Sequence, residues 1–304
     1  MNLYPATAFI RHLLTARSAT GHGVHSPYVF DFLNDVVRGK NNAGVITEVE
    51  KLRQEMLSDR RTVRVTDLGA GSARGSGEER RISDIASAAA LPPKQVGLLA
   101  RIAQGAGAYK AQSDAVPRMR EGAEQASDNS IILELGTSLG ISALALALAA
   151  PERRVVTVEG CPALAGIARN NLLKHGALNA EVINMEFSAA LEMLGTGGTT
   201  VSLAFIDGNH RGGALTQYAE TIRSMGEEML IVADDIHLNG EMYRAWSSLA
   251  TSGTGERPPG ARSLQAARLP AAPAEIATAS METFRFGILF CIRNLTPGQY
   301  RIRY

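Results

Sequence analysis

The sequence is poor in cysteine and has no long run of apolar residues. Two cysteines, Cys161 and Cys291, occur far apart among 304 residues, which excludes a disulfide framework and a cysteine-based zinc site. No apolar stretch reaches the roughly 18 residues that a membrane-spanning helix needs. The first residues, MNLYPATAFIRHLL, lack the basic start, apolar core and cleavage site of a secretory signal. We therefore expect a cytoplasmic protein with no membrane partner.

An excess of charge of either sign is also absent. The chain has 31 Lys and Arg against 30 Asp and Glu, a formal net charge of +1. Without a strongly basic composition, a nucleic-acid partner is not expected. Hydrophobic residues make up 45% and charged residues 20%, which is typical of a globular protein. The length suits one large domain or two small ones.

The first 125 residues predict a mainly helical extension. Apolar residues recur at helical spacing over residues 1–40, and further helices are predicted at 82–90 and 93–108, with a short strand at 62–68. The segment GHGVHSPYVF contains His22, His25 and Tyr28. It either covers an active site as a lid or forms the N-cap region of the next helix.

From residue 129 onward the pattern alternates between strands and helices. We predict strands near 130–135, 154–159, 181–184, 201–206 and 229–233, and helices near 140–149, 162–175, 212–225 and 240–250. Two closing strands are predicted near 274–281 and 284–292, after a loop rich in Gly and Pro at 251–272. This alternation is typical of an α/β protein whose mostly parallel sheet is covered on both faces.

The segment IILELGTSLGISALALA predicts a strand, a glycine turn and a helix. The strand ends near Glu134, and the turn runs through Gly136 and Gly140. Such glycines let the backbone approach a ligand closely, and the helix start offers N–H groups. A second strand ends in Glu159, 23 residues after Gly136, where a carboxylate can accept both ribose hydroxyls of an adenosine ligand. The carboxylate of Glu134 would repel a pyrophosphate but attract the cationic sulfonium and ammonium of S-adenosylmethionine, which favours that cofactor over NAD.

ELGTSLGIS followed by VTVEGCP resembles the first two motifs of the class I S-adenosylmethionine-dependent methyltransferases, especially the catechol and caffeoyl-CoA type O-methyltransferases. The resemblance covers residues 126–304, which we expect to form the cofactor-binding domain. It implies a Rossmann-like, seven-stranded, mostly parallel sheet whose last strand is antiparallel. It also implies that the ribose lies at Glu159 and that the methionine part is surrounded by Glu134, Gly136, Ser138, Gly140 and Ser142, with Asp207 as a further cofactor contact.

A second glycine motif, VTDLGAGS at 65–72, competes for the cofactor. It offers Asp67, Gly69 and Gly71, but no strand that ends in an acidic residue follows at the right distance. We favour a structural turn or a lid element and keep a cofactor role as the alternative. DLGAGS, HGVHSPYVF and the helix RISDIA together resemble an N-terminal extension found in a bacterial group of methyltransferases.

Three aspartates follow neighbouring predicted strands. Asp207 lies in FIDGNH, and Asp234 and Asp235 lie in VADDIH, at the carboxyl ends where open α/β sheets bind ligands. Three convergent carboxylates suit a hard cation such as Mg²⁺ or Ca²⁺. The related O-methyltransferases are similar but carry Asp-Asn where this chain has Asp-Asp. The chain resembles more closely a branch written FIDG-x-H and DDI, in which a metal cannot be assumed.

Two histidines are candidates for the catalytic base. His210 stands three residues after Asp207, where the catechol-type enzymes carry a basic lysine, and an imidazole there could take a hydroxyl proton. His237, beside the aspartate pair, is the second candidate. For the adenine contact the sequence leaves Glu186 and Ser188 open.

The sequence therefore predicts a methyltransferase that O-methylates a small hydroxylated acceptor by direct displacement, with His210 and Asp207 as catalytic residues and a divalent metal as an optional assistant. The alternatives are a cofactor-binding interaction module without turnover, an RNA or protein methyltransferase, and an aminopropyl transferase. No N-P-P-Y-type tetrapeptide occurs, which lowers the case for methylation of base amines. A homodimer is expected only by analogy with related O-methyltransferases.

Overall fold

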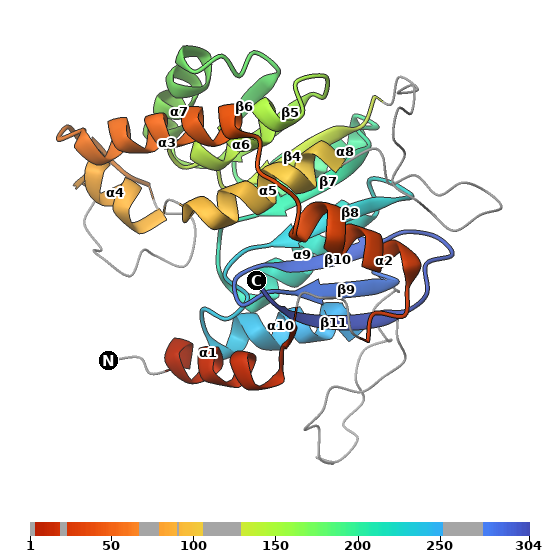
Figure 1. Ribbon diagram of the computed structural model, residues 1–304. Coiled ribbons are helices and arrows are strands. Elements are labelled where there is room, and N and C mark those ends of the chain that lie inside the picture. The colour runs from red at the N-terminus through yellow and green to blue at the C-terminus, as the bar shows by residue number, and fades with distance from the viewer. Residues whose placement is uncertain (1–3, 19–22, 67–78, 90, 106–128, 252–275) are drawn as a thin grey trace.

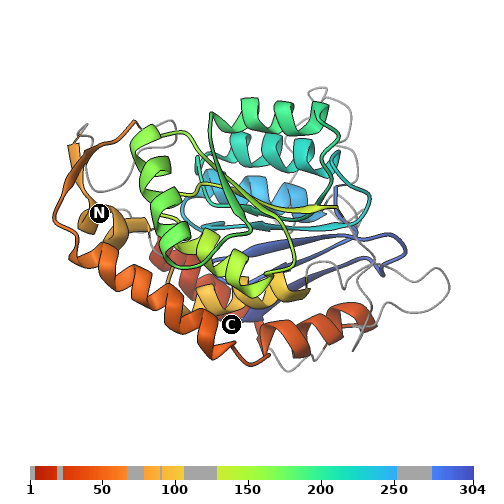
Figure 2. The ribbon, with the colours of Figure 1, turned by 90° about the horizontal axis from the view of Figure 1, so that it is seen from above.

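The computed structural model describes residues 4–18, 23–66, 79–89, 91–105, 129–251 and 276–304. These residues build one large twisted sheet with helices on both faces (Figures 1 and 2). His22, the DLGAGS motif and almost all of the predicted Gly- and Pro-rich loop fall outside the described residues, so the predictions made for them stay open.

The main sheet has nine strands in the described part of the chain, in the order β1-β11-β9-β10-β8-β7-β4-β5-β6. Seven of these strands form the part of the sheet that was predicted from residue 129 onward. They are β4 (Ile131–Leu135), β5 (Val155–Glu159), β6 (Ala180–Asn184), β7 (Val201–Ile206), β8 (Met229–Ala233), β9 (Ala279–Glu282) and β10 (Gly287–Cys291). Among these seven, β10 is antiparallel to both of its neighbours, whereas β4 to β8 pair in parallel. This confirms the predicted seven-stranded core and its antiparallel last strand.

Two further strands extend the sheet beyond β9 and were not predicted. β11 (Gly298–Arg303) pairs in parallel with β9, and the two-residue β1 (Arg17–Ser18) pairs in parallel with β11. The N-terminal region thus contributes a strand to the same sheet as the cofactor-binding motifs. A separate small hairpin joins β2 (Thr62–Arg64) and β3 (Glu79–Arg81).

Two hydrophobic clusters cover the two faces of the sheet. On one face the helices are α8 (Phe187–Thr196), α9 (Gly212–Arg223) and α10 (Gly240–Thr251). On the other they are α2 (Pro27–Phe32), the π-helical turn η1 (Leu33–Val37), α3 (Ala43–Ser58), α4 (Ile82–Ala89), α5 (Pro93–Gly105), α6 (Ile141–Ala149) and α7 (Pro162–Lys174). Because both faces are covered, β4 and β8 are buried along their whole length.

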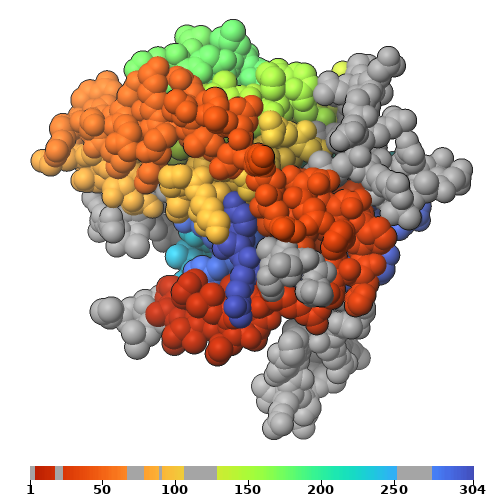
Figure 3. Space-filling model, viewed as in Figure 1, coloured from red at the N-terminus to blue at the C-terminus, as the bar shows by residue number. Residues whose placement is uncertain are grey.

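The helices before residue 106 share a core with the sheet. Side chains such as Phe32 and Leu52 belong to the same buried cluster as Phe205 and Phe290 of the central strands, and the space-filling view shows these N-terminal helices covering much of one face (Figure 3). The extension therefore packs on the sheet through apolar burial, which favours folding by about 25 cal/mol per Å² of apolar surface removed from water.

The segment HGVHSPYVF forms a helix start, as one of the two sequence alternatives predicts. Ser26 is the N-cap of α2 and accepts a hydrogen bond from the backbone N–H of Val29, with Pro27 in the first turn. Tyr28 is buried and His25 is exposed.

The remaining N-terminal helix, α1 (Tyr4–Thr15), lies beside β11 and α10 at one end of the molecule (Figure 1). Its inward positions are Ala8 and His12. None of the helices in the described residues is long and apolar enough to cross a membrane.

Candidate cofactor and active site

The glycine turn after β4 adopts backbone conformations that most residues avoid. Gly136 has a φ of 108°, Gly140 has a φ of 84°, and Ser138 between them has a φ of 48°. The N–H of Gly136 donates to the carbonyl of Val158 at 3.0 Å, and the Asn171 side-chain amide donates to the carbonyl of Leu139 at 2.9 Å. The turn is thus held from both sides, and the N-cap residue of α6, Gly140, has no side chain with which to cap the helix.

Glu134 carries a buried carboxylate oxygen that has no partner among the described residues. Its side chain is fully buried in β4, and Thr157 donates a hydrogen bond to Oε2, whereas Oε1 has none. Burial raises the pKa of Glu134 to about 7, although the nearby hydroxyls of Ser142 and Thr157 oppose the shift, and the charge of Glu159 adds to it. A cation bound beside this carboxylate would satisfy the free oxygen and stabilise its charge.

Glu159, at the end of β5, lies against the same turn. One carboxylate oxygen accepts the N–H of Ser138 at 2.8 Å, and the other accepts the N–H of Cys161 at 2.9 Å. The side chain is therefore fixed beside the glycine turn.

The three predicted aspartates meet at the carboxyl edge of the sheet, but an arginine lies among them. Arg285, in the turn between β9 and β10, donates to both oxygens of the buried Asp234, from Nε at 2.7 Å and from Nη2 at 2.6 Å. The same Nη2 lies 3.4 Å from Asp235 Oδ1. Burial and the charges of Asp234 and Asp235 raise the pKa of Asp207 well above its ordinary value, while Arg285 opposes the shift.

His210 stands beside these carboxyl groups. Its Nε2 atom lies 3.8 Å from Asp207 Oδ1, which is too far for a hydrogen bond, and the side chain is 26% exposed. The preceding Asn209 has a φ of 49° and donates from its side chain to Tyr218 Oη at 2.9 Å. The histidine is therefore held on a turn at the edge of the site and remains accessible to a ligand.

The segment proposed to meet an adenine forms the start of α8. Glu186 is the N-cap of this helix and accepts the N–H of Ala189 at 3.1 Å, so its carboxylate already has a structural partner. Phe187 packs against Gly208, where a Cβ atom would lie 2.6 Å from the ring. The structure brings this segment next to the end of β7 without deciding between Glu186 and Ser188.

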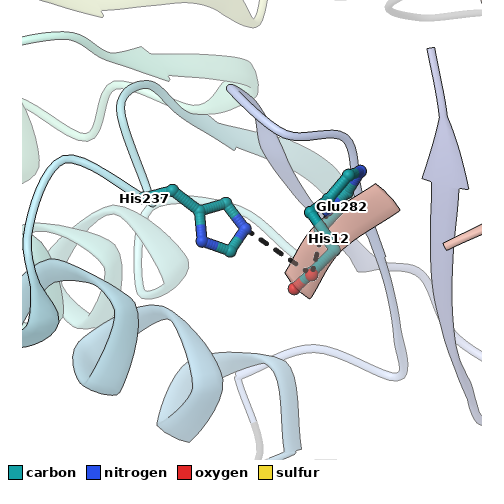
Figure 4. Close-up of side chains that lie close together, drawn as sticks. All are labelled: His12, His237 and Glu282. Atoms are coloured by element: carbon teal, nitrogen blue, oxygen red, sulfur yellow. Dashed lines mark ion pairs between the residues drawn. The ribbon is translucent and has the colours of Figure 1, made fainter. Parts of the chain in front are cut away.

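His237 does not join the three aspartates. It is buried and lies 3.7 Å from Glu282, near His12 of α1 (Figure 4). Four residues were not predicted from the sequence: Arg285 beside the aspartates, Thr157 beside Glu134, and His12 and Glu282 beside His237. Thr157 could have been found, because it lies two residues before Glu159 in β5 and so shares its side of the strand. No local pattern marks Arg285, which is 51 residues from Asp234.

Comparison with known proteins finds a family model that matches part of the chain. Residues 133–236, about a third of the chain, match the model of a family described as a methyltransferase domain. No curated protein matches the chain significantly.

Several solved structures are similar in part. Cofactor-bound Rv0187 from MTB is 21% identical, with a TM-score of 0.46, over 88% of this chain and 97% of that one. The O-methyltransferase TomG of Streptomyces achromogenes, in complex with S-adenosylmethionine (SAM), is 19% identical, with a TM-score of 0.45, over 73% and 84%. An O-methyltransferase of Bacillus cereus in complex with SAH is 16% identical, with a TM-score of 0.44, over 74% and 86%.

The residues matched to the methyltransferase model include both acidic motifs, at Glu134 and Glu159, and the aspartates that follow β7 and β8. They lie on a sheet whose seven-stranded core ends in an antiparallel strand, as that family's resemblance implies. Residues 133–236 thus match a methyltransferase domain.

Proposed function

We propose that this methyltransferase transfers the methyl group to the oxygen of a small hydroxylated acceptor. The observation that carries the proposal is the position of His210, an accessible imidazole 3.8 Å from the half-buried carboxyl group of Asp207, at the same sheet edge as the glycine turn. A base at this place can remove the acceptor's proton while the methyl group moves to the oxygen. The near-neutral charge of the chain supports a small acceptor over a nucleic acid.

The residues around the glycine turn fit S-adenosylmethionine. When bound, this cofactor supplies a methyl group on a positively charged sulfur. The orphaned Oε1 atom of Glu134 suits the cofactor's cationic amino-acid part, and Glu159 suits the ribose hydroxyls. Gly136 leaves room beside the end of β7, because a Cβ atom there would lie 2.1 Å from the carbonyl oxygen of Asp207. Ser142 contributes a buried hydroxyl on the first turn of α6.

His210 and Asp207 divide the acid–base work. His210 accepts the hydroxyl proton, and the imidazolium that forms lies beside the carboxyl group of Asp207. Asp207 is held by its own N–H, which donates to the carbonyl of Leu135 at 2.8 Å. Burial and the neighbouring carboxylates raise the pKa of Asp207, and the positive charge of a protonated His210 beside it would favour the ionised carboxylate.

The three aspartates do not fit a divalent metal ion well. Arg285 already provides the positive charge that Asp234 and Asp235 need, through a two-pronged ion pair. Among the described residues, a different group has the geometry of a potential metal site. Its members are His12, His237 and Glu282, whose donor atoms lie within 4.8 Å of one another. Mg²⁺ or Ca²⁺ at the aspartates remains a prediction of the sequence, and the proposed proton transfer does not require it.

The proposal is tested by methyl transfer from radiolabelled S-adenosylmethionine to a panel of phenols, catechols and aliphatic alcohols. With an accepted substrate, His210→Gln should lower kcat by roughly 10²- to 10⁴-fold, the usual contribution of a general base, while S-adenosylhomocysteine still binds. The exposed His25→Gln serves as the matched control and should leave kcat unchanged. Cofactor binding without transfer to any hydroxyl compound would support the interaction-module alternative. Transfer that is insensitive to His210→Gln would remove His210 as the base.

A further inference from the structure

Two histidines and a glutamate from three distant segments meet at one buried point (Figure 4). His12 lies in the last turn of α1, His237 lies in the loop after β8, and Glu282 ends β9. Their exposed fractions are 3%, 4% and 8%. His12 Nδ1 lies 3.8 Å, and His237 Nε2 lies 3.7 Å, from the same oxygen, Oε1 of Glu282.

The hydrogen bond that His12 makes through Nε2 leaves a lone pair on its Nδ1 atom. Its Nε2 atom lies 3.1 Å from the backbone carbonyl oxygen of Ile302. Because a carbonyl only accepts, Nε2 carries the hydrogen, so Nδ1 of the neutral ring holds a lone pair. That lone pair faces a carboxylate oxygen and has no hydrogen-bond partner in the described part of the chain. Two electron-rich atoms face each other here, and an intervening cation would turn the repulsion into attraction.

His237 is fixed by stacking and not by hydrogen bonds. Its ring lies between Tyr243, with a centroid distance of 4.6 Å, and Phe284, at 5.1 Å and nearly parallel. Neither ring nitrogen has a hydrogen-bond partner among the residues that the structure describes. A buried polar atom without a partner costs about 1–3 kcal/mol. With His12, three buried nitrogen atoms are therefore unsatisfied around one carboxylate.

Glu282 is held as an ionised carboxylate. Trp246 donates to Oε2 at 2.8 Å, and Arg301 donates to Oε1. Since each carboxylate oxygen has two lone pairs, Oε1 can bind a cation and still accept from Arg301.

We propose that His12, His237 and Glu282 form a binding site for a divalent transition-metal ion, with Zn²⁺ as the best match. Two imidazoles and one carboxylate are a known zinc donor set, and three protein ligands leave a fourth position for water. Donor atoms about 2.0–2.1 Å from a tetrahedral zinc ion lie roughly 3.3 Å apart, so separations of 3.7 and 3.8 Å need only a small closure. The bond from His12 to Ile302 is the outer hydrogen bond that usually orients a metal-binding histidine.

The donor set also selects the kind of metal. Imidazole nitrogens suit Zn²⁺, whereas Mg²⁺ and Ca²⁺ prefer a set of oxygen ligands. Arg301 already neutralises Glu282, so attraction by charge alone is weak and selectivity rests on the two histidines. Because His12 belongs to α1 and the other two residues to the sheet edge, the ion would fasten α1 to the body of the protein. This site is separate from the Asp207, Asp234 and Arg285 group.

Metal content of the untagged chain tests the proposal directly. The protein is stripped with a chelator, dialysed against excess Zn²⁺, freed of loose metal and measured by mass spectrometry. We expect one zinc ion per chain in the wild type and in the control His25→Ala, and close to none in His12→Ala and His237→Ala. Co²⁺ in place of zinc should give the visible ligand-field absorption of a tetrahedral site in the wild type only. S-adenosylhomocysteine affinity should be unchanged in His12→Ala, which separates this site from the proposed function.

A wild type that retains no zinc would overturn the proposal. Zinc retained equally by the histidine variants would overturn it too. If both variants fail to fold, the wild type decides through hydrogen exchange of residues 4–15. Zinc should slow exchange of this helix in the stripped protein, and exchange that zinc does not change would contradict the site.

Discussion

The carbonyl oxygen of Asp207 lies 2.1 Å from the point where a Cβ atom of residue 136 would stand. Gly136 and the end of β7 therefore pack backbone against backbone, and the glycine turn is in direct contact with the segment that carries Asp207 and His210. With a φ of 108° at Gly136, a side chain is excluded for conformational as well as steric reasons.

Replacing Gly136 should lower the free energy of unfolding, although the glycine has no side chain whose contacts could be lost. Gly136→Ala forces Asp207 to move and places alanine in a strained conformation, so we expect a loss of at least about 2 kcal/mol in the free energy of unfolding. Gly166→Ala is the matched control, because a Cβ atom there meets nothing within 4 Å. In the interior of α7 it should stabilise by roughly 0.5–1 kcal/mol. Urea unfolding of both variants measures the difference, and equal effects would contradict the packing argument.

Glu134 should couple cofactor affinity to pH. Its pKa is about 7 in the free protein. As the pH falls below that value, a growing fraction of the molecules carries a protonated Glu134, which must lose its proton before it can pair with the cofactor's cationic group. We expect the wild-type affinity for S-adenosylhomocysteine to rise between pH 6 and pH 8. In Glu134→Gln it should be weaker and nearly flat over the same range. A flat wild-type profile measured by calorimetry would argue against an ammonium group at Glu134.

The same residue should lower stability at alkaline pH. Its pKa in the folded state lies above the ordinary value of 4.5, so the folded state binds more protons than the unfolded chain. The stability that protonated Glu134 contributes is present below pH 4.5 and is lost as the pH rises through about 7. Glu134→Gln should therefore be more stable than the wild type at pH 8, by up to roughly 3 kcal/mol, and similar to it near pH 4. Thermal unfolding at both values checks the sign.

Arg285 should be essential for the stability of the aspartate group. Arg285→Gln leaves Asp234, which is 1% exposed, as a buried charge without its partner, and we expect a loss of about 3 kcal/mol at pH 8. The loss should shrink at pH 5, because protonation of the crowded carboxyl groups relieves their repulsion. Arg293→Gln is the control, since Arg293 is exposed and pairs with the exposed Glu227. Its effect should stay within about 1 kcal/mol, and a similar effect of both changes would disprove the role of Arg285.

The sequence predicted the parts of the fold that have a local signal. Strands with continuous apolar runs, such as β7 and β8, were placed at the residues where the structure has them, because burial on both faces demands such runs. β11 was missed because its sequence, GQYRIR, alternates polar and apolar residues and lies at the less buried side of the sheet. The π-helical turn and α8 were also not predicted.

For the candidate site, the sequence could likewise bring together only the residues that one local unit contains. Glu134, Gly136 and Glu159 sit in one strand–turn–helix–strand unit, so their spacing alone indicates a common ligand. Arg285 and the pairing of His12 with Glu282 depend on contacts between segments that are far apart in the sequence. No periodicity records such contacts, and for that reason a divalent metal ion, and not an arginine, was considered as the positive charge among the carboxylates.

Calorimetric titration with S-adenosylhomocysteine tests the central claim, that the turn between Glu134 and Glu159 binds the cofactor. The wild type should bind with micromolar affinity, and Glu159→Ala should lose that binding. Glu181→Ala, an exposed residue of the neighbouring strand β6 that pairs with Arg154, should bind like the wild type. Mg²⁺ should leave all three titrations unchanged, since Arg285 already neutralises the aspartates. Absence of binding by the wild type, or full binding by Glu159→Ala, would contradict the account.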